Sequence, residues 1–186
     1  MSKTIVITAG HGIRNGRTDS GAVAKDGTTE ASIAVDMRGI IKYYLERSGI
    51  TVLTDGVGKE NKSLADAVKL IGRGAVAVEI HTNASANANA KGVEVLSLNK
   101  DKPLAQKIAA AIGGVTGFSL RGDKGWQPQS ISPHGRLAYV SGGGLIVELF
   151  FISNPTELAV YREKRWLIGK AIARVLAEHV GVVFVE

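Results

Sequence analysis

Short apolar runs alternate along the chain with longer stretches in which apolar residues recur every three or four positions. The short runs have the length of buried strands, and the longer stretches have the period of amphipathic helices. This pattern predicts strands over Thr4–Thr8, Ile50–Thr54, Ala75–His81, Gly92–Leu98 and Leu145–Ile152. It predicts helices over Glu30–Ser48, Leu64–Gly72, Pro103–Ile112 and Thr156–Val180.

Local signals mark several boundaries of these elements. Ser63 is an expected N-cap, Gly49 should end the first helix, and the pair Gly113-Gly114 should end the third helix. The segments Asn83–Lys91 and Arg121–Gly135 are rich in small, polar, Gly or Pro residues and read as loops.

Strands that alternate with helices predict an α/β fold with a mostly parallel, twisted central sheet. Continuously apolar strands, such as VAVEI and LIVELFF, indicate that helices cover both faces of this sheet. The chain of 186 residues shows neither an internal repeat nor a linker. We therefore expect a single domain over residues 1–186.

The bulk composition restricts the chemistry. The chain has no cysteine, which excludes disulfides, thiolate metal sites and a cysteine nucleophile. Its formal net charge is +6, which favours an anionic partner. The basic residues are scattered without a nucleic-acid-binding pattern, and no apolar run approaches the ~20 residues of a membrane helix. We expect no nucleic-acid partner and no stable membrane insertion.

Polar side chains with catalytic potential lie where the strands end. His11 follows the first strand, and His81 and Asn83 lie at the end of the third. Ligands of parallel α/β sheets bind beyond the carboxyl ends of the strands. Glu148 interrupts the apolar run Leu145–Ile152, where a lone ionised carboxylate is costly unless it is paired, neutralised or bound to a metal.

Two imidazoles and one carboxylate, with an open fourth position, form a common catalytic zinc site. HExxH is absent, so the ligands must come from distant parts of the chain. Glu30 is a candidate for the carboxylate. A Glu in the first helical turn also interacts favourably with the helix dipole, by roughly 0.3–1 kcal/mol, so the spacing leaves both roles open.

The motifs TAGHG, TDSGAVAKDGTTEASIA, TVLT, VEIHTNA, GVEV, RG and LIVELFFISNPTE follow one another in this order. This order resembles the zinc-dependent N-acetylmuramoyl-L-alanine amidases of the Amidase_3 type, over residues 4–179. The resemblance implies the fold of that family, with a phosphorylase/hydrolase-like α/β sheet. It also implies one Zn²⁺ per chain, held by His11, Glu30 and His81, with Glu148 as the catalytic base.

The implied reaction is hydrolysis of the amide between the lactyl group of N-acetylmuramic acid and the L-alanine of the stem peptide. Asn83 could hydrogen-bond the substrate or cap its own loop. Arg136 could contact the stem peptide, although a solvated surface Arg is the simpler interpretation. Glu79 departs from the family pattern; we favour a pairing with Lys or Arg over a role beside the metal ligands.

The resemblance also implies a biological setting. A single catalytic domain without a signal peptide or a separate cell-wall-binding domain is typical of phage endolysins, which are antimicrobial enzymes. We therefore expect a monomer made in the host cytoplasm that degrades peptidoglycan after release. Three alternatives remain: a bacterial autolysin or sporulation amidase, a zinc carboxypeptidase acting on stem peptides, and a non-catalytic wall-binding module.

Overall fold

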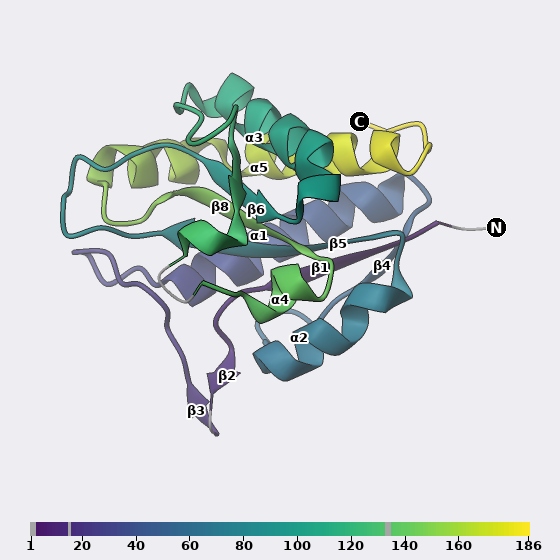
Figure 1. Ribbon diagram of the computed structural model, residues 1–186, viewed down its shortest axis with the longest axis horizontal. Coiled ribbons are helices and arrows are strands. Elements are labelled where there is room, and N and C mark those ends of the chain that lie inside the picture. Colours follow the sequence, from purple (N-terminus) through teal and green to yellow (C-terminus); the bar gives the residue numbers. More distant parts are fainter. Residues whose placement is uncertain (1–2, 15, 133–134) are drawn as a thin grey trace.

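A six-stranded sheet forms the centre of the molecule in this computed structural model, which describes residues 3–14, 16–132 and 135–186 (Figure 1). Its order is β4-β1-β5-β8-β6-β7. In that order the strands are Thr51–Leu53, Thr4–Ala9, Val76–Asn83, Leu145–Phe151, Glu94–Ser97 and Trp126–Pro128. The first four are mutually parallel, β6 runs antiparallel to β8, and β7 runs parallel to β6. The predicted mostly parallel α/β fold is confirmed.

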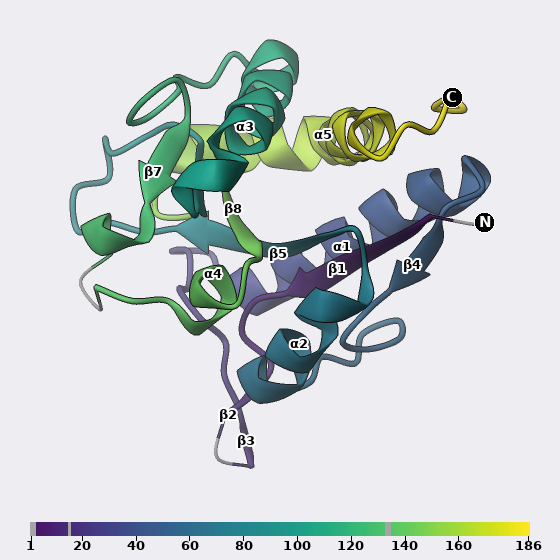
Figure 2. The same ribbon diagram turned by 45° about the vertical axis from the view of Figure 1, so that its right-hand side comes forward.

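Helices cover both faces of this sheet (Figure 2). One face carries α1 (Glu30–Arg47), α3 (Lys102–Thr116) and α5 (Pro155–His179). The other carries α2 (Leu64–Leu70) and the short α4 (Ala138–Ser141). The larger apolar cluster lies under α1, α3 and α5, and the smaller one lies under α2 and α4.

Successive side chains of β5 point to opposite faces of the sheet. Val78 and Ile80 belong to the larger cluster, whereas Ala77 belongs to the smaller one. The same alternation places Glu79 and His81 on the face of α2 and α4.

Most predicted helix starts agree with the structure, and one predicted end is wrong. The Ser63 hydroxyl accepts a hydrogen bond from the Asp66 amide, as expected of the N-cap of α2. The third predicted helix does not end at Gly113-Gly114, because α3 continues to Thr116. Gly117, with a φ of 79°, ends it in the left-handed conformation that favours glycine.

Several short elements were not predicted. The expected loop at Arg121–Gly135 contains the edge strand β7 and a 3₁₀ turn at Gln129–Ile131. The hairpin strands β2 (Ile13–Arg14) and β3 (Arg17–Thr18), as well as α4, are also additions to the prediction. Each has two to four residues, too few to show a hydrophobic period.

The C-terminal segment after α5 folds back against α1. The Val185 amide donates to the Ser48 hydroxyl, and the Phe184 ring lies 6.2 Å from that of Tyr44. The Glu186 carboxylate forms ion pairs with Lys170 and Arg174 of α5.

Among the described residues, no helix combines the length and the apolarity needed to cross a membrane.

Candidate metal centre

His11 stands on a tight turn that begins where β1 ends. Its φ of 57° lies in the left-handed region, which is uncommon for a residue other than glycine. The Asn61 side-chain amide lies 3.0, 3.2 and 2.9 Å from the carbonyl oxygens of Ala9, Gly10 and His11. One amide therefore holds three successive carbonyls of this turn.

A buried ion pair between Arg38 and Asp55 lies next to Asn61 and holds its side chain in place. Arg38 of α1 donates to Asp55 at 2.7 Å and to the Asn61 side-chain oxygen at 3.1 Å. Asp55 also accepts from the Ala9 amide. Both charged residues are about 2% exposed, so the pairing is needed to offset their desolvation.

Glu30 is the first residue of α1 and is buried. Thr29 caps the helix by accepting from the Ser32 amide. The Glu30 carboxylate accepts from the amide of Thr82 through Oε1 and from that of Ala22 through Oε2, each at 3.0 Å. These bonds hold the carboxylate at the end of β5, where His81 lies.

The structure brings His11, Glu30 and His81 together. His11 Nε2 lies 3.1 Å from Glu30 Oε2, and His81 Nδ1 lies 3.0 Å from Glu30 Oε1. One nitrogen or oxygen ligand atom from each residue lies within 4.8 Å of the others. Two imidazole nitrogens and a carboxylate oxygen are a donor set that suits zinc and leaves room for a further ligand.

The charges of these groups are strongly coupled. Burial alone would lower the pKa of His11 and of His81, but hydrogen bonds with Glu30 outweigh it and raise both. Burial alone would raise the pKa of Glu30, yet hydrogen bonds with His11 and His81 hold it far below its usual value. The Glu30 carboxylate is therefore ionised at neutral pH and carries a negative charge that can bind a cation.

A second carboxylate contacts the outer nitrogen of each ring. His11 Nδ1 lies 3.2 Å from Asp19, and His81 Nε2 lies 3.1 Å from Glu79. The expected pairing of Glu79 with Lys or Arg is wrong. In a strand, residues two apart lie on the same face, so the sequence could have indicated that Glu79 lies beside His81. Asp19 lies in a loop, where the sequence gives no comparable indication of a contact with His11.

Glu148 lies on β8 directly beside the cluster. In the sheet register it is paired with His81 on one side and with Glu94 of β6 on the other. Burial raises the pKa of Glu148 to about 7; the Glu30 and Glu94 charges add to this and His81 opposes it. Among the described residues, its buried Oε2 has no hydrogen-bond partner, so one carboxylate oxygen is free to act on a ligand.

Asn83 belongs to β5 and not to the following loop, where the sequence had placed it. Its amide donates to Glu94 at 2.8 Å, and Glu94 also accepts from Arg121 at 2.8 Å.

Arg136 is exposed, and no described hydrogen bond or ion pair joins it to the cluster. Glu94 is buried next to Glu148 and was not recognised from the sequence. The residue pattern of one strand does not show which residues of the adjacent strands lie beside it.

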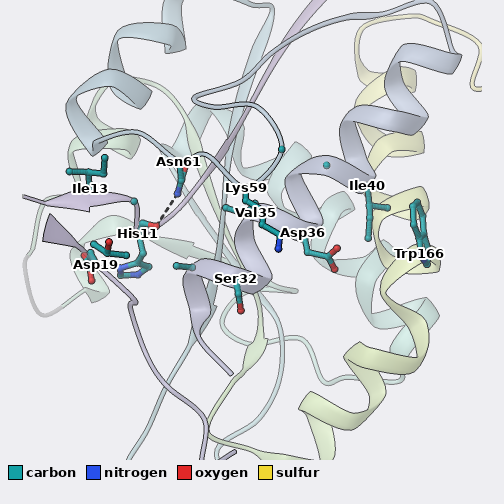
Figure 3. Close-up of a pocket in the computed structure, with 15 residues that line it drawn as sticks. His11, Ile13, Asp19, Ser32, Val35, Asp36, Ile40, Lys59, Asn61 and Trp166 are labelled. Atoms are coloured by element: carbon teal, nitrogen blue, oxygen red, sulfur yellow. Dashed lines mark hydrogen bonds and ion pairs between the residues drawn. The ribbon is translucent and has the colours of Figure 1, made fainter. Parts of the chain in front are cut away.

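Two cavities meet at His11 and Asp19. The larger, of about 710 Å³, follows the outer side of α1 from His11 to Trp166 (Figure 3). The smaller, of about 380 Å³, is lined by Glu79, His81 and Tyr139. The figure also shows the hydrogen bond from Asn61 to His11 at the rim of the larger cavity. The cluster is therefore accessible to a ligand.

Comparisons with known proteins identify the family of the chain. Residues 5–178 match the Amidase_3 family, N-acetylmuramoyl-L-alanine amidase. A solved structure from Neisseria meningitidis, provisionally described as an N-acetylmuramoyl-L-alanine amidase, is 46% identical, with a TM-score of 0.89 and 98% of each chain covered. No curated protein matches the chain.

Two more distant structures share the fold. The catalytic domain of CwlV, an N-acetylmuramoyl-L-alanine amidase from Bacillus (Paenibacillus) polymyxa var. colistinus, is 22% identical, with a TM-score of 0.82 and coverage of 97% of this chain and 99% of that chain. The catalytic domain of an endolysin targeting Clostridia difficile is 23% identical, with a TM-score of 0.74 and coverage of 95% and 97%. The family match over nearly the whole length decides the assignment: the chain belongs to the Amidase_3 family of N-acetylmuramoyl-L-alanine amidases.

Proposed function

We propose that this protein is a zinc-dependent hydrolase that cleaves peptidoglycan between the lactyl group of N-acetylmuramic acid and the L-alanine of the stem peptide. The observation that carries the proposal is that His11, Glu30 and His81 each bring one ligand atom within 4.8 Å of the others. Beside them lies Glu148, whose buried Oε2 has no hydrogen-bond partner in the described part of the chain. The three residues would hold one zinc ion. When bound, zinc supplies the Lewis acidity that activates water and polarises a scissile carbonyl.

Glu148 performs the proton transfers of this mechanism. Its free carboxylate oxygen accepts the proton of the attacking water and later delivers it to the leaving amine of L-alanine. A pKa of about 7 suits a group that must both take up and release a proton near neutral pH. Glu148 is only partly buried as a residue, so a water molecule can reach its side chain, while its Oε2 atom is shielded from solvent.

Mass spectrometry of purified peptidoglycan digested by the protein, with and without a chelator, tests the reaction. We expect stem peptides that begin at L-alanine and glycan without peptides, both lost on chelation and restored by zinc. Peptides trimmed at their far end would instead indicate a carboxypeptidase. Digestion that a chelator leaves unchanged would contradict the zinc requirement.

Two variants test the assigned roles separately. Glu148→Gln should lose about 10²–10⁴-fold in rate while it retains zinc, because an amide cannot accept the proton. His81→Ala should lose both zinc and activity, because a ligand is missing. A Glu148→Gln protein with full activity would favour a wall-binding module over an enzyme, and a His81→Ala protein with stoichiometric zinc would contradict the ligand assignment.

For the biological setting we propose phage-driven lysis of a bacterial host, with wall turnover or sporulation as the alternative. An endolysin catalytic domain has the same fold, which is compatible with such a role. The net charge of +6 would favour approach to an anionic wall. The protein produced inside bacteria together with a pore-forming holin should lyse them within minutes. Separation of daughter cells without lysis would favour wall turnover.

A further inference from the structure

The two ring nitrogens of His81 contact different carboxylates. Nδ1 lies 3.0 Å from Glu30, on the side of the candidate metal position, and Nε2 lies 3.1 Å from Glu79. Glu79 precedes His81 by two residues in β5, so both side chains leave the strand on the same face. The strand itself thus aligns this carboxylate with the outer nitrogen of the ring.

Glu79 is a costly residue at this position. It is only 3% exposed and lies between Val78 and Ile80, which are both fully buried. The cavity on this side is also lined by Tyr139 and Ile146, and the Tyr139 hydroxyl is hydrogen-bonded to Thr8. Within residues 3–14, 16–132 and 135–186, no Lys or Arg forms an ion pair with Glu79. Its described hydrogen bond goes to His81, so the desolvated carboxylate is directed at this ring.

We propose that Glu79 is a positioning residue for the metal ligand His81. When zinc is bound, the Glu79 carboxylate would accept the proton of Nε2, which would fix the tautomer in which Nδ1, beside Glu30, has its lone pair available for the ion. A carboxylate on the outer nitrogen also increases the basicity of the ligating nitrogen. The inference rests on the proposed zinc site and extends it to a residue that touches no substrate.

His11 provides an internal comparison. Its Nδ1 contacts Asp19 at 3.2 Å while its Nε2 faces Glu30, so the arrangement is the same. The Asp19 side chain is 31% exposed, whereas that of Glu79 is 4% exposed. A hydrogen bond shielded from water is stronger, so we expect His81 to depend on Glu79 more than His11 depends on Asp19.

Zinc affinity, measured by competition with a chromophoric chelator, tests the proposal without reference to activity. Glu79→Ala should weaken zinc binding by about 10–100-fold. Glu79→Gln should weaken it less, because the amide oxygen can still accept the Nε2 proton although the charge is lost. Glu157→Gln is the matched control: Glu157 is a buried acid that accepts from the Gly92 and Phe151 amides, away from the cluster. It should lower stability and leave the zinc affinity unchanged.

Nitrogen-15 NMR of the zinc-loaded protein provides a second readout. We expect the proton of His81 on Nε2 and the metal on Nδ1. Zinc affinities of Glu79→Ala and Glu79→Gln within twofold of the wild type, or a proton on Nδ1, would overturn the inference and leave the proposed function intact. A wild-type protein that binds no zinc would overturn both.

Discussion

The absence of a side chain at Gly10 makes room for the imidazole ring of His81. A Cβ atom built there would lie 2.2, 2.4 and 2.5 Å from three atoms of the His81 ring. Gly10→Ala should therefore push the ring away from Glu30 and weaken zinc binding by about tenfold or more, although no ligand is removed. Competition with a chelator measures this.

The control for this prediction is Gly114→Ala in α3, where a Cβ would meet no atom within 4 Å. It should raise the free energy of unfolding by about 0.5–1 kcal/mol and leave zinc affinity unchanged. Wild-type zinc affinity in Gly10→Ala would mean that the turn after β1 can shift without cost.

The buried carboxyl of Glu148 should make stability depend on pH. Its pKa is raised from 4.5 to about 7 in the folded protein, so the folded state keeps a proton that the unfolded state releases. The associated stability is present below pH 4.5 and is lost as the pH rises through 7. Glu148→Gln has no such loss, so its stability relative to wild type should increase by about 2–3 kcal/mol across this range.

Urea unfolding of both proteins at pH 4 to 8, with a chelator present, measures the difference. A difference that stays constant with pH would show that Glu148 is not held in its protonated form by burial. A difference of the opposite sign would show that His81 dominates its environment.

At the scale of elements, Asn61 connects the segment before α2 with the end of β1 and with α1. Its side chain bonds three carbonyls of the His11 turn and Arg38. Asn61→Ala would leave these groups without their partner and release the left-handed turn. We expect a loss of about 1–3 kcal/mol in the free energy of unfolding and weaker zinc binding, measured by urea titration and chelator competition.

Asn89→Ala, in the exposed loop after β5, is the matched control and should change neither quantity. If Asn61→Ala lost stability but kept wild-type zinc affinity, the turn would be held by other contacts. The buried Arg38–Asp55 pair would then be the first candidate.

At the scale of the whole molecule, a bound zinc ion would link three elements of the sheet and its helical layer. His11 follows β1, Glu30 begins α1 and His81 lies in β5. Zinc at 100 times its dissociation constant should raise the free energy of unfolding by about 2.7 kcal/mol. Differential scanning calorimetry should show a higher Tm with zinc than with a chelator, and the same Tm in both for His81→Ala. A zinc-dependent rise in the Tm of His81→Ala would indicate another metal site.

Much of the fold followed from the sequence because its periodicity is local. The strands at Thr4–Ala9, Val76–Asn83 and Leu145–Phe151 are apolar runs, and α1 and α5 keep a helical period over many turns. Short elements were missed because two to four residues carry no period. The end of α3 was misplaced because Gly113 and Gly114 remain helical despite their weak propensity, and the helix ends only at Gly117, which adopts the left-handed conformation.

The sequence by itself determined which chemical groups are present and that His11, His81 and Glu148 are associated with sheet strands. Their motif order also resembled a known family, which the comparisons confirm. Only the tertiary structure decided that Glu30 meets both imidazoles, that Glu79 and Asp19 contact their outer nitrogens, and that Glu94 faces Glu148. The reason is physical: a strand's own residues specify which face a side chain takes, whereas its neighbours across the sheet depend on strand order and register, which are set by packing between distant segments.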